Sequence, residues 1–207
     1  MDLIDTPVGP ARVDVRPARG RQRLTLVLGH GAGGGIEAAD LLALAEALPR
    51  RGVSVVRVEQ PWRVAGRKVA AAPGTLDQAW RAVLTALNLP GRVAVGGRSA
   101  GARVACRTAT EVGAMACVAL AFPLHPPGRP ERSRLDELTG AGVPTLVLQG
   151  ERDAFGSPAA FPRKRSSRYV VRPVPGADHS FRVTRGHDRA ATLAGLASMV
   201  GDWLLER

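Results

Sequence analysis

The stretch GGRSAGAR in the middle of the chain contains the pattern G-x-S-x-G, with a serine at position 99. A serine in such a turn can attack a carbonyl carbon when a nearby base removes its hydroxyl proton. The pattern is short, however, and it also describes a glycine-rich turn in which the serine has no chemical role. The function of Ser99 therefore depends on which other residues the fold brings beside it.

A histidine and an acid later in the chain are candidates for the rest of this chemistry. His179, in the loop PGADHSF, could act as the base, and Asp153, in the turn GERDAFG, could orient that histidine. Glu151 is the competing acid, but it directly adjoins the preceding apolar run and points less surely toward a shared site. Taken singly, these residues are equally consistent with a surface acid and an exposed loop histidine.

The glycine-rich loop HGAGGG at residues 30–35 is a further candidate element. Glycines allow backbone N–H groups to face a cavity without obstruction, and such groups can stabilise a developing oxyanion. The alternative is a flexible turn between a strand and a helix. His30 belongs to this loop and is expected to make structural hydrogen bonds, while His125 and His187 lie in loops that do not closely follow a strand.

Apolar runs alternate with helical patterns along the chain, and this alternation predicts the fold class. Runs typical of buried strands occupy residues 24–30, 53–61, 92–97, 116–123, 143–150 and 167–176, and helical spacing covers residues 39–52, 75–91, 99–112 and 192–207. Strand–helix–strand order joins parallel strands by crossover helices. We therefore predict an α/β fold: a mostly parallel, doubly wound sheet of about six to seven strands, with helices on both faces, in one domain over residues 1–207.

Smaller features complete this prediction. Residues 13–18 are a candidate antiparallel edge strand, and Thr75 is a candidate cap for the helix at 75–91. The Pro- and Arg-rich segment 123–142 contains one short helix candidate at 133–140 and is too short for a second domain or a cap domain.

The candidate residues share one place in the predicted sheet. The glycine loop, Ser99, Asp153 and His179 each follow a different predicted strand. In a doubly wound sheet the site forms beyond the carboxyl ends of the strands. Their joint placement favours a Ser–Asp–His triad over four unrelated turns.

Composition narrows the protein classes. Hydrophobic residues make up 45% of the chain, which is a globular composition. No apolar run approaches the roughly 20 residues of a membrane span, and the N-terminal segment lacks the apolar core of a signal peptide, so we expect a cytoplasmic protein. Cys106 and Cys117 are too few for a disulfide framework or a zinc site and are expected to be buried thiols.

The charge of the chain is strongly positive. The net charge is +11, and only two of the 29 basic residues are lysines. The arginines are scattered rather than gathered on one element, which argues against a nucleic-acid partner, and no membrane partner is expected. The basic run FPRKRSSR at 161–168 is interpreted as solvated surface, with a contact to an anionic partner as the alternative.

With these residues in place, the sequence resembles the alpha/beta-hydrolase family from about Leu24 to the C-terminus. HGAGG resembles the oxyanion loop of that family, GRSAG its nucleophile elbow, GERDAFG its acid turn and GADHSF its histidine turn. GGRSAGAR and QPWRVAGRKVAAAP look most like the small, lidless, dienelactone-hydrolase-like group, which includes bacterial proteins of unassigned substrate. Dienelactone hydrolases use a cysteine nucleophile, whereas this chain has Ser99.

The resemblance implies a serine hydrolase that cleaves a carboxylic ester or thioester through an acyl-enzyme on Ser99. His179 would be the base and Asp153 its orienting acid, and the amides of Ala32 and Ala100 would bind the oxyanion. Neither a metal nor an organic cofactor is needed. Because some relatives of this group belong to chromatin-associated complexes, the alternative is a noncatalytic interaction protein on the same fold.

The sequence says less about the substrate, for which a small-molecule ester is expected. A segment of only about 20 residues is available for a lid between the strands near Phe122 and Val143, which favours an open site. The loop at residues 60–75 is expected to form one rim of that site, with Trp62 as a candidate substrate-binding residue and its packing as a hydrophobic wall as the alternative. Arg98 adjoins the serine, so we hypothesise a preference for esters that carry a carboxylate or phosphate, with a solvated surface arginine as the alternative.

Overall fold

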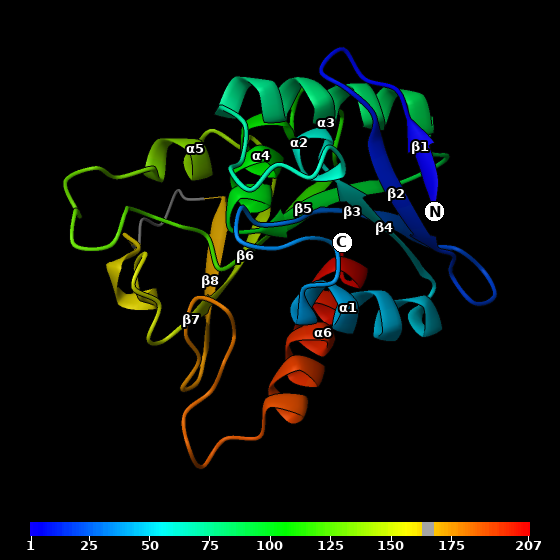
Figure 1. Cartoon of the computed structure of the whole chain (residues 1–207). Coiled ribbons are helices and arrows are strands. Elements are labelled where there is room, and N and C mark those ends of the chain that lie inside the picture. The colour runs from blue at the N-terminus through cyan, green and yellow to red at the C-terminus, as the bar shows by residue number, and fades with distance from the viewer. Residues whose placement is uncertain (163–167) are drawn as a thin grey trace.

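Eight strands form one sheet in the computed structural model, which describes residues 1–162 and 168–207 (Figure 1). Their spatial order is β1-β2-β4-β3-β5-β6-β7-β8. The strands are β1 Asp2–Ile4, β2 Ala11–Arg16, β3 Leu24–Gly29, β4 Val53–Glu59, β5 Val93–Arg98, β6 Ala116–Leu120, β7 Thr145–Gly150 and β8 Tyr169–Val174. From β4 to β8 all neighbours are parallel, while β1 and β2 are antiparallel additions at one edge.

The mostly parallel sheet confirms the predicted fold class, but the strand count of six to seven was too low. The additional strand is β1, which pairs with β2 and displaces it from the edge of the sheet. Its three residues are too few for an apolar run or an alternation to be recognised in the sequence.

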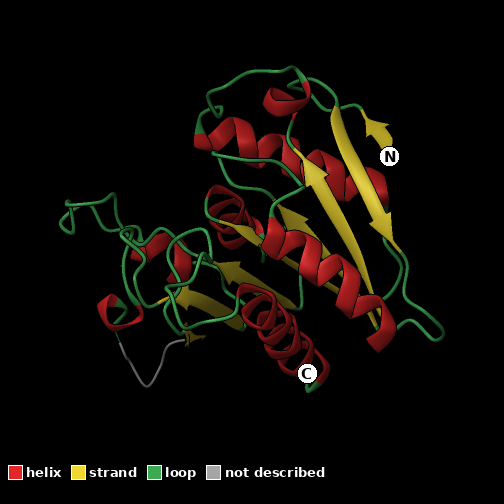
Figure 2. Cartoon of the chain, turned by 60° about the horizontal axis from the view of Figure 1, so that its bottom comes forward, coloured by secondary structure: helices red, strands yellow, loops and turns green. Residues whose placement is uncertain are grey.

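Helices cover both faces of the sheet, as Figures 1 and 2 show. The α-helices are α1 Ala39–Ala47, α2 Pro61–Val64, α3 Pro73–Leu87, α4 Ala100–Thr108, α5 Leu135–Thr139 and α6 Arg189–Leu205, and the short 3-10 turns are η1 Leu48–Arg51 and η2 Pro158–Ala160. α1 packs against α6 on one face, and α3 packs against α4 on the other.

The strands contribute alternate residues to two separate cores. In β3, Leu26 and Leu28 join the core under α1 and α6, whereas Val27 joins the core under α3 and α4. Ala94 and Val95 of β5 divide between the two cores in the same way. Because both faces are covered, the strands read as continuous apolar runs rather than as alternating patterns.

Two helix starts differ from the sequence prediction. α3 begins at Pro73, with Ala72 as its N-cap, so Thr75 is not the cap. Proline suits the first helical position because it lacks the N–H that would be unpaired there. α6 begins at Arg189, since the Asp188 side chain accepts a hydrogen bond from the Ala190 amide at 2.8 Å.

The segment between β6 and β7 is anchored to α4 and forms no cap domain. Glu137 of α5 accepts hydrogen bonds from Arg103 at 2.7 Å and from Arg107 at 2.9 Å. Burial alone would raise the pKa of Glu137, but the two guanidinium groups outweigh it and hold that pKa below its usual value. These ion pairs fix α5 beside α4.

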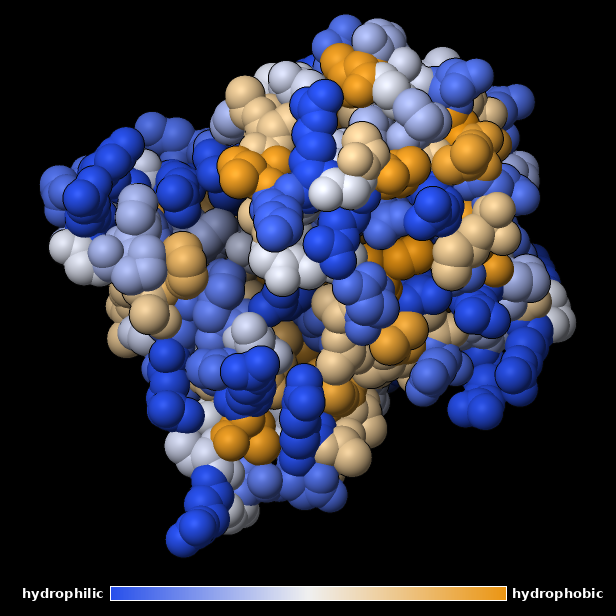
Figure 3. Space-filling view, viewed as in Figure 1, coloured by the Kyte–Doolittle hydropathy of each residue, from blue (hydrophilic) through white to orange (hydrophobic). Residues whose placement is uncertain are grey.

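The hydropathy of the surface and the burial of the two thiols are those expected from a globular composition. The face in Figure 3 is mostly hydrophilic, with hydrophobic residues in small separate groups. Cys106 and Cys117 are buried free thiols, with their sulfur atoms 3.8 Å apart. Within the described ranges, no helix is long and apolar enough to cross a bilayer. Of the basic run 161–168, residues 163–167 lie outside the part of the chain that the structure describes.

Candidate active site

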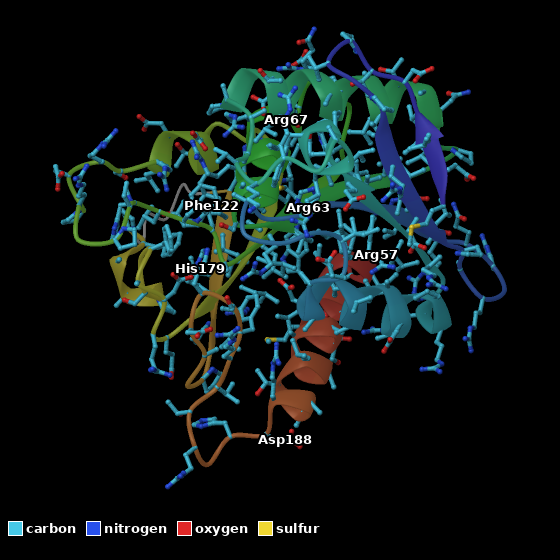
Figure 4. All side chains as sticks on the ribbon, viewed as in Figure 1. Arg57, Arg63, Arg67, Phe122, His179 and Asp188 are labelled. Atoms are coloured by element: carbon cyan, nitrogen blue, oxygen red, sulfur yellow. The ribbon has the colours of Figure 1, made fainter. Side chains whose placement is uncertain are left out.

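The predicted site residues meet at the carboxyl edge of the parallel strands. Ser99 follows β5, Asp153 follows β7, and His179 lies in the loop after β8. Figure 4 labels His179 beside this end of the sheet. Three loops that are far apart in the sequence are thereby brought together, as a doubly wound sheet requires.

Ser99 occupies a sharp, strained turn between β5 and α4. Its backbone has φ 52° and ψ −110°, in the left-handed half of conformational space that side chains rarely adopt. The Ser99 amide donates to the Leu120 carbonyl at 2.9 Å, which ties the turn to β6. The turn therefore presents Oγ beyond the sheet at the start of a helix.

The glycines around Ser99 are required by close backbone contacts. A Cβ at Gly101 would lie 2.3 Å from the Gly29 carbonyl oxygen, and one at Gly97 would lie 2.5 Å from the same atom. The start of α4 can thus pack directly against the end of β3. This contact, rather than any freedom of φ, explains both glycines of the G-x-S-x-G pattern.

Ser99, His179 and Asp153 form one line of hydrogen bonds. Ser99 Oγ lies 3.0 Å from His179 Nε2, and His179 Nδ1 lies 2.8 Å from Asp153 Oδ2. The Asp153 side chain is fully buried, and the His179 side chain is 20% exposed. An ionised carboxylate only accepts hydrogen bonds, so the proton belongs on Nδ1 and the Nε2 lone pair faces the serine hydroxyl.

Two residues that the sequence analysis did not identify hold this line in place. The Gln149 amide donates to Asp153 Oδ2 at 2.8 Å, and the Phe155 backbone N–H donates to Asp153 Oδ1 at 2.8 Å. The Phe155 ring also packs on the His179 imidazole, with ring centroids 4.2 Å apart. In the sequence, the one signal for this support is that Gln149 is a polar residue at the end of the apolar run TLVLQ.

Backbone amides near Ser99 suit the binding of an oxyanion. Ala100 is the first residue of α4, where the amide has no partner within the helix. The loop of Ala32 passes beside the serine, since a Cβ at Gly31 would lie 3.4 Å from Ser99 Cβ. The amide of Ala100 and the glycine loop that contains Ala32 therefore come from two different elements close to Ser99, and the binding of an oxyanion by both amides remains a prediction.

His30 fixes the glycine loop. The backbone N–H of Gln60 donates to His30 Nε2 at 3.0 Å. The ring proton is therefore on Nδ1, which donates to the Gly31 carbonyl at 2.8 Å. Burial lowers the pKa of His30, and the ring is neutral at pH 7. These are the structural hydrogen bonds that the sequence analysis expected.

Trp62 lies in the wall of a narrow slot next to the glycine loop. Its side chain is buried, with 5% of the residue exposed, and its ring centroid is 5.6 Å from that of His30. The slot has a free volume of about 10 Å³ and is lined in part by Trp62, Leu76, Val104, Ala32 and Ala100. Only a very small group fits this space without movement of its walls.

Arg98 lies beside the site, but its guanidinium is directed at protein groups. Nε is 3.2 Å from a carboxylate oxygen of Asp40, and Nη2 donates to the His179 carbonyl at 2.8 Å. The Arg98 side chain is only 12% exposed. These contacts give no support to the expected role of Arg98 in binding an anionic substrate.

The competing residues lie elsewhere. Glu151 accepts a hydrogen bond from the Gly176 amide at 2.9 Å and is exposed. His125 contacts the Pro126 carbonyl, and His187 contacts Thr184. In the described part of the chain, no group of three or more His, Cys, Asp or Glu side chains is arranged to hold a metal ion.

The chain is similar to one protein family in sequence and to solved structures in fold. The sequence pattern of a family described as "Alpha/beta hydrolase domain" matches residues 22–204. No curated protein matches the chain.

Three solved structures illustrate the similarity of fold. An alpha-beta serine hydrolase homologue from Coxiella burnetii has a TM-score of 0.78 at 20% identity, over 98% of this chain and 96% of that one. A serine hydrolase without a lid from Xanthomonas campestris has a TM-score of 0.73 at 22% identity, over 97% and 93%. Dienelactone hydrolase from Anabaena variabilis has a TM-score of 0.75 at 18% identity, over 99% and 95%.

Proposed function

The chain belongs to the alpha/beta hydrolase family, and on that premise we propose that it is a serine hydrolase that cleaves a carboxylic ester or thioester. The observation that carries the proposal is the line of hydrogen bonds from Ser99 through His179 to the buried Asp153. Each of the three side chains comes from a different loop, so this alignment is a property of the whole fold. It is the arrangement that nucleophilic catalysis by serine requires.

In the acylation half, Ser99 Oγ forms a bond to the substrate carbonyl carbon while His179 Nε2 accepts the hydroxyl proton. The carbonyl electron pair moves onto oxygen, and the amides of Ala32 and Ala100 donate to that oxyanion. One such donor is typically worth about 2.7–4 kcal/mol of transition-state stabilisation. The bond to the alcohol or thiol then breaks, and His179 returns the proton to this leaving group. Asp153 keeps the imidazole in the reactive tautomer throughout.

In the deacylation half, water replaces the departed alcohol. His179 accepts a proton from the water as its oxygen attacks the acyl carbon, and the same two amides hold the second oxyanion. Collapse of this intermediate releases a carboxylic acid and returns the proton to Ser99. The net reaction consumes one water for each ester bond.

The slot beside the glycine loop supports a preference for small acyl groups. Trp62 and Ala100 both line it, and Ala100 is adjacent to the serine that would carry the acyl chain. The free volume of about 10 Å³ does not accommodate a long chain. We therefore keep Trp62 as a substrate-binding residue, in the wall that limits acyl length.

This preference predicts that kcat/KM falls along a series of p-nitrophenyl esters from acetate to octanoate. The expected difference is at least about tenfold, as is typical when added methylenes do not fit a pocket. Trp62→Phe should narrow the difference by enlarging the slot, while Trp203→Phe on α6 should not change it. Equal kcat/KM values for acetate and octanoate in the wild-type protein would contradict the assignment.

The proposed function is tested most directly with a fluorophosphonate probe. Attack by Oγ on phosphorus would expel fluoride and leave a stable covalent adduct on Ser99, located by peptide mass. Ser198→Ala, which removes an exposed serine from α6, should label at the wild-type rate. A folded protein that gains no adduct on Ser99 would favour the noncatalytic interaction protein instead.

A further inference from the structure

Arg98 is placed to hold the loop that carries His179. Its Nη2 donates to the carbonyl of His179 itself at 2.8 Å and to Ser180 Oγ at 3.1 Å. Arg98 also immediately precedes Ser99 in the chain. One side chain therefore connects the strand end that carries the serine with the backbone of the histidine.

The direction of the Arg98 side chain follows from its strand. Alternation along β5 places Ala94 in the core under α1 and α6 and Val95 in the core under α3 and α4. Position 98 has the same parity as 94, so its side chain emerges on the α1 side of the sheet. α1 begins there, and Asp40 is its second residue.

Asp40 anchors the guanidinium through Nε, whereas the histidine loop contacts Nη2. Its Oδ2 lies 3.2 Å from Arg98 Nε, as an ion pair without an aligned hydrogen bond, and only 3% of Asp40 is exposed. Burial raises the pKa of Asp40, and the charge of Arg98 offsets part of that rise. A buried carboxylate that loses its cation strongly destabilises the folded protein. The Asp40 carboxylate therefore needs the Arg98 guanidinium beside it, and in return it holds that guanidinium in place.

The histidine loop also has bonds of its own, and these define the competing explanation. Asp178 Oδ1 accepts hydrogen bonds from the Ser180 amide at 2.8 Å and from the Arg182 amide at 2.9 Å, and Phe181 is fully buried. If these contacts alone fix the loop, Arg98 is dispensable. Neither of these two hydrogen bonds, however, joins the histidine loop to the strand end that carries Ser99.

We propose that Arg98, held by Asp40, is a positioning residue that sets the distance between His179 and Ser99. The ion pair fixes the guanidinium against α1, and the guanidinium fixes the His179 carbonyl. A misplacement of reacting groups by about 1 Å can cost about 100-fold in rate. This inference rests on the proposed hydrolase function and adds a determinant of its geometry.

The kinetic test compares Arg98→Ala and Arg98→Lys with wild type on a neutral ester. Arg98→Ala should lower kcat by about 10- to 100-fold with little change in KM, because the base is misplaced but the substrate contacts remain. Lysine should restore part of the loss, and low concentrations of methylguanidinium should partly rescue Arg98→Ala. Arg81→Ala, which removes an arginine from the exposed pair with Glu111, should retain wild-type kinetics.

Asp40→Asn keeps the shape of the anchor and removes its charge. It should lower kcat in the same direction as Arg98→Ala but by less. The double variant should be no slower than Arg98→Ala alone, because both changes act through one guanidinium. A double variant with fully additive losses would contradict the dependence of Arg98 on Asp40.

Hydrogen–deuterium exchange provides a readout that does not need activity. Exchange in residues 177–183 should be faster in Arg98→Ala than in Arg81→Ala. Unchanged kcat and unchanged exchange in folded Arg98→Ala would overturn the proposal. A loss confined to KM for carboxylate-bearing esters would also overturn it, in favour of a substrate-binding arginine. If wild type neither hydrolyses esters nor reacts with fluorophosphonate, the hydrolase function fails, while the exchange measurement still tests the hold on the loop.

Discussion

Replacing Ser99 with alanine is expected to lower kcat for ester hydrolysis by about 10⁴- to 10⁶-fold, the range found when a serine nucleophile is removed from an aligned triad. The structure gives His179 Nε2 one serine hydroxyl at 3.0 Å and buries Asp153 behind it. Without Oγ the same imidazole can only activate water, and no acyl-enzyme forms. Measurement of kcat with burst-phase kinetics on an activated ester would show both the rate loss and the absence of the burst.

The control for Ser99→Ala is its folding. Alanine retains Cβ, so the backbone strain at position 99 and the packing of α4 are unchanged, and the free energy of unfolding should stay close to that of the wild type. Ser198→Ala should retain both the rate and the burst. Residual activity within tenfold of the wild type in Ser99→Ala would show that another residue is the nucleophile.

Replacing Gly101 with alanine is expected to lower the free energy of unfolding by about 3 kcal/mol, near the upper end of the range for overpacked sites. The new Cβ would lie 2.3 Å from the Gly29 carbonyl oxygen and 2.8 Å from the His30 carbonyl oxygen, and both contacts are with backbone. Relief requires α4 to move away from β3. Urea denaturation of the variant and the wild type gives the difference directly.

Gly195→Ala is the matched control for this substitution. Gly195 is exposed in α6, and a Cβ there would meet no atom within 4 Å. Alanine should therefore stabilise the protein there by about 0.5–1 kcal/mol, through the helix propensity of alanine. If Gly101→Ala proved as stable as the wild type, the close approach of α4 to β3 would not explain the glycine of the serine turn.

The sequence was sufficient for the features that depend on chain order. Alternating strands and helices predicted the parallel sheet, and the positions of Ser99, Asp153 and His179 after three different strands predicted that they would meet. Each of these three positions can be predicted locally, because it requires only that the strand directly before the residue is recognised in the sequence. The same reasoning placed His30 in a structural role before its partners were known.

Features that depend on pairs of distant residues were not predictable in this way. Asp40 is an acid at the start of a helix, which many helices have, and nothing in the sequence pairs it with Arg98. Arg98 was interpreted as a substrate contact because it adjoins Ser99, although alternation along β5 directs its side chain toward α1. The hydrogen bond from Gln149 to Asp153 was likewise not predictable, because it depends on the geometry of the turn between them, which the spacing of the two residues does not reveal.

The strained backbone at Ser99 has a consequence for the evolution of this fold. A residue with a side chain in such a conformation typically costs about 1–3 kcal/mol, a cost that glycine largely avoids. Selection for folding alone would therefore replace serine by glycine at this position, and the gain would be a sizeable share of the 5–15 kcal/mol that holds a typical domain folded. On the proposed hydrolase function, the hydroxyl of Ser99 compensates for this loss of stability. We therefore expect relatives that have become interaction proteins to carry glycine at this position instead.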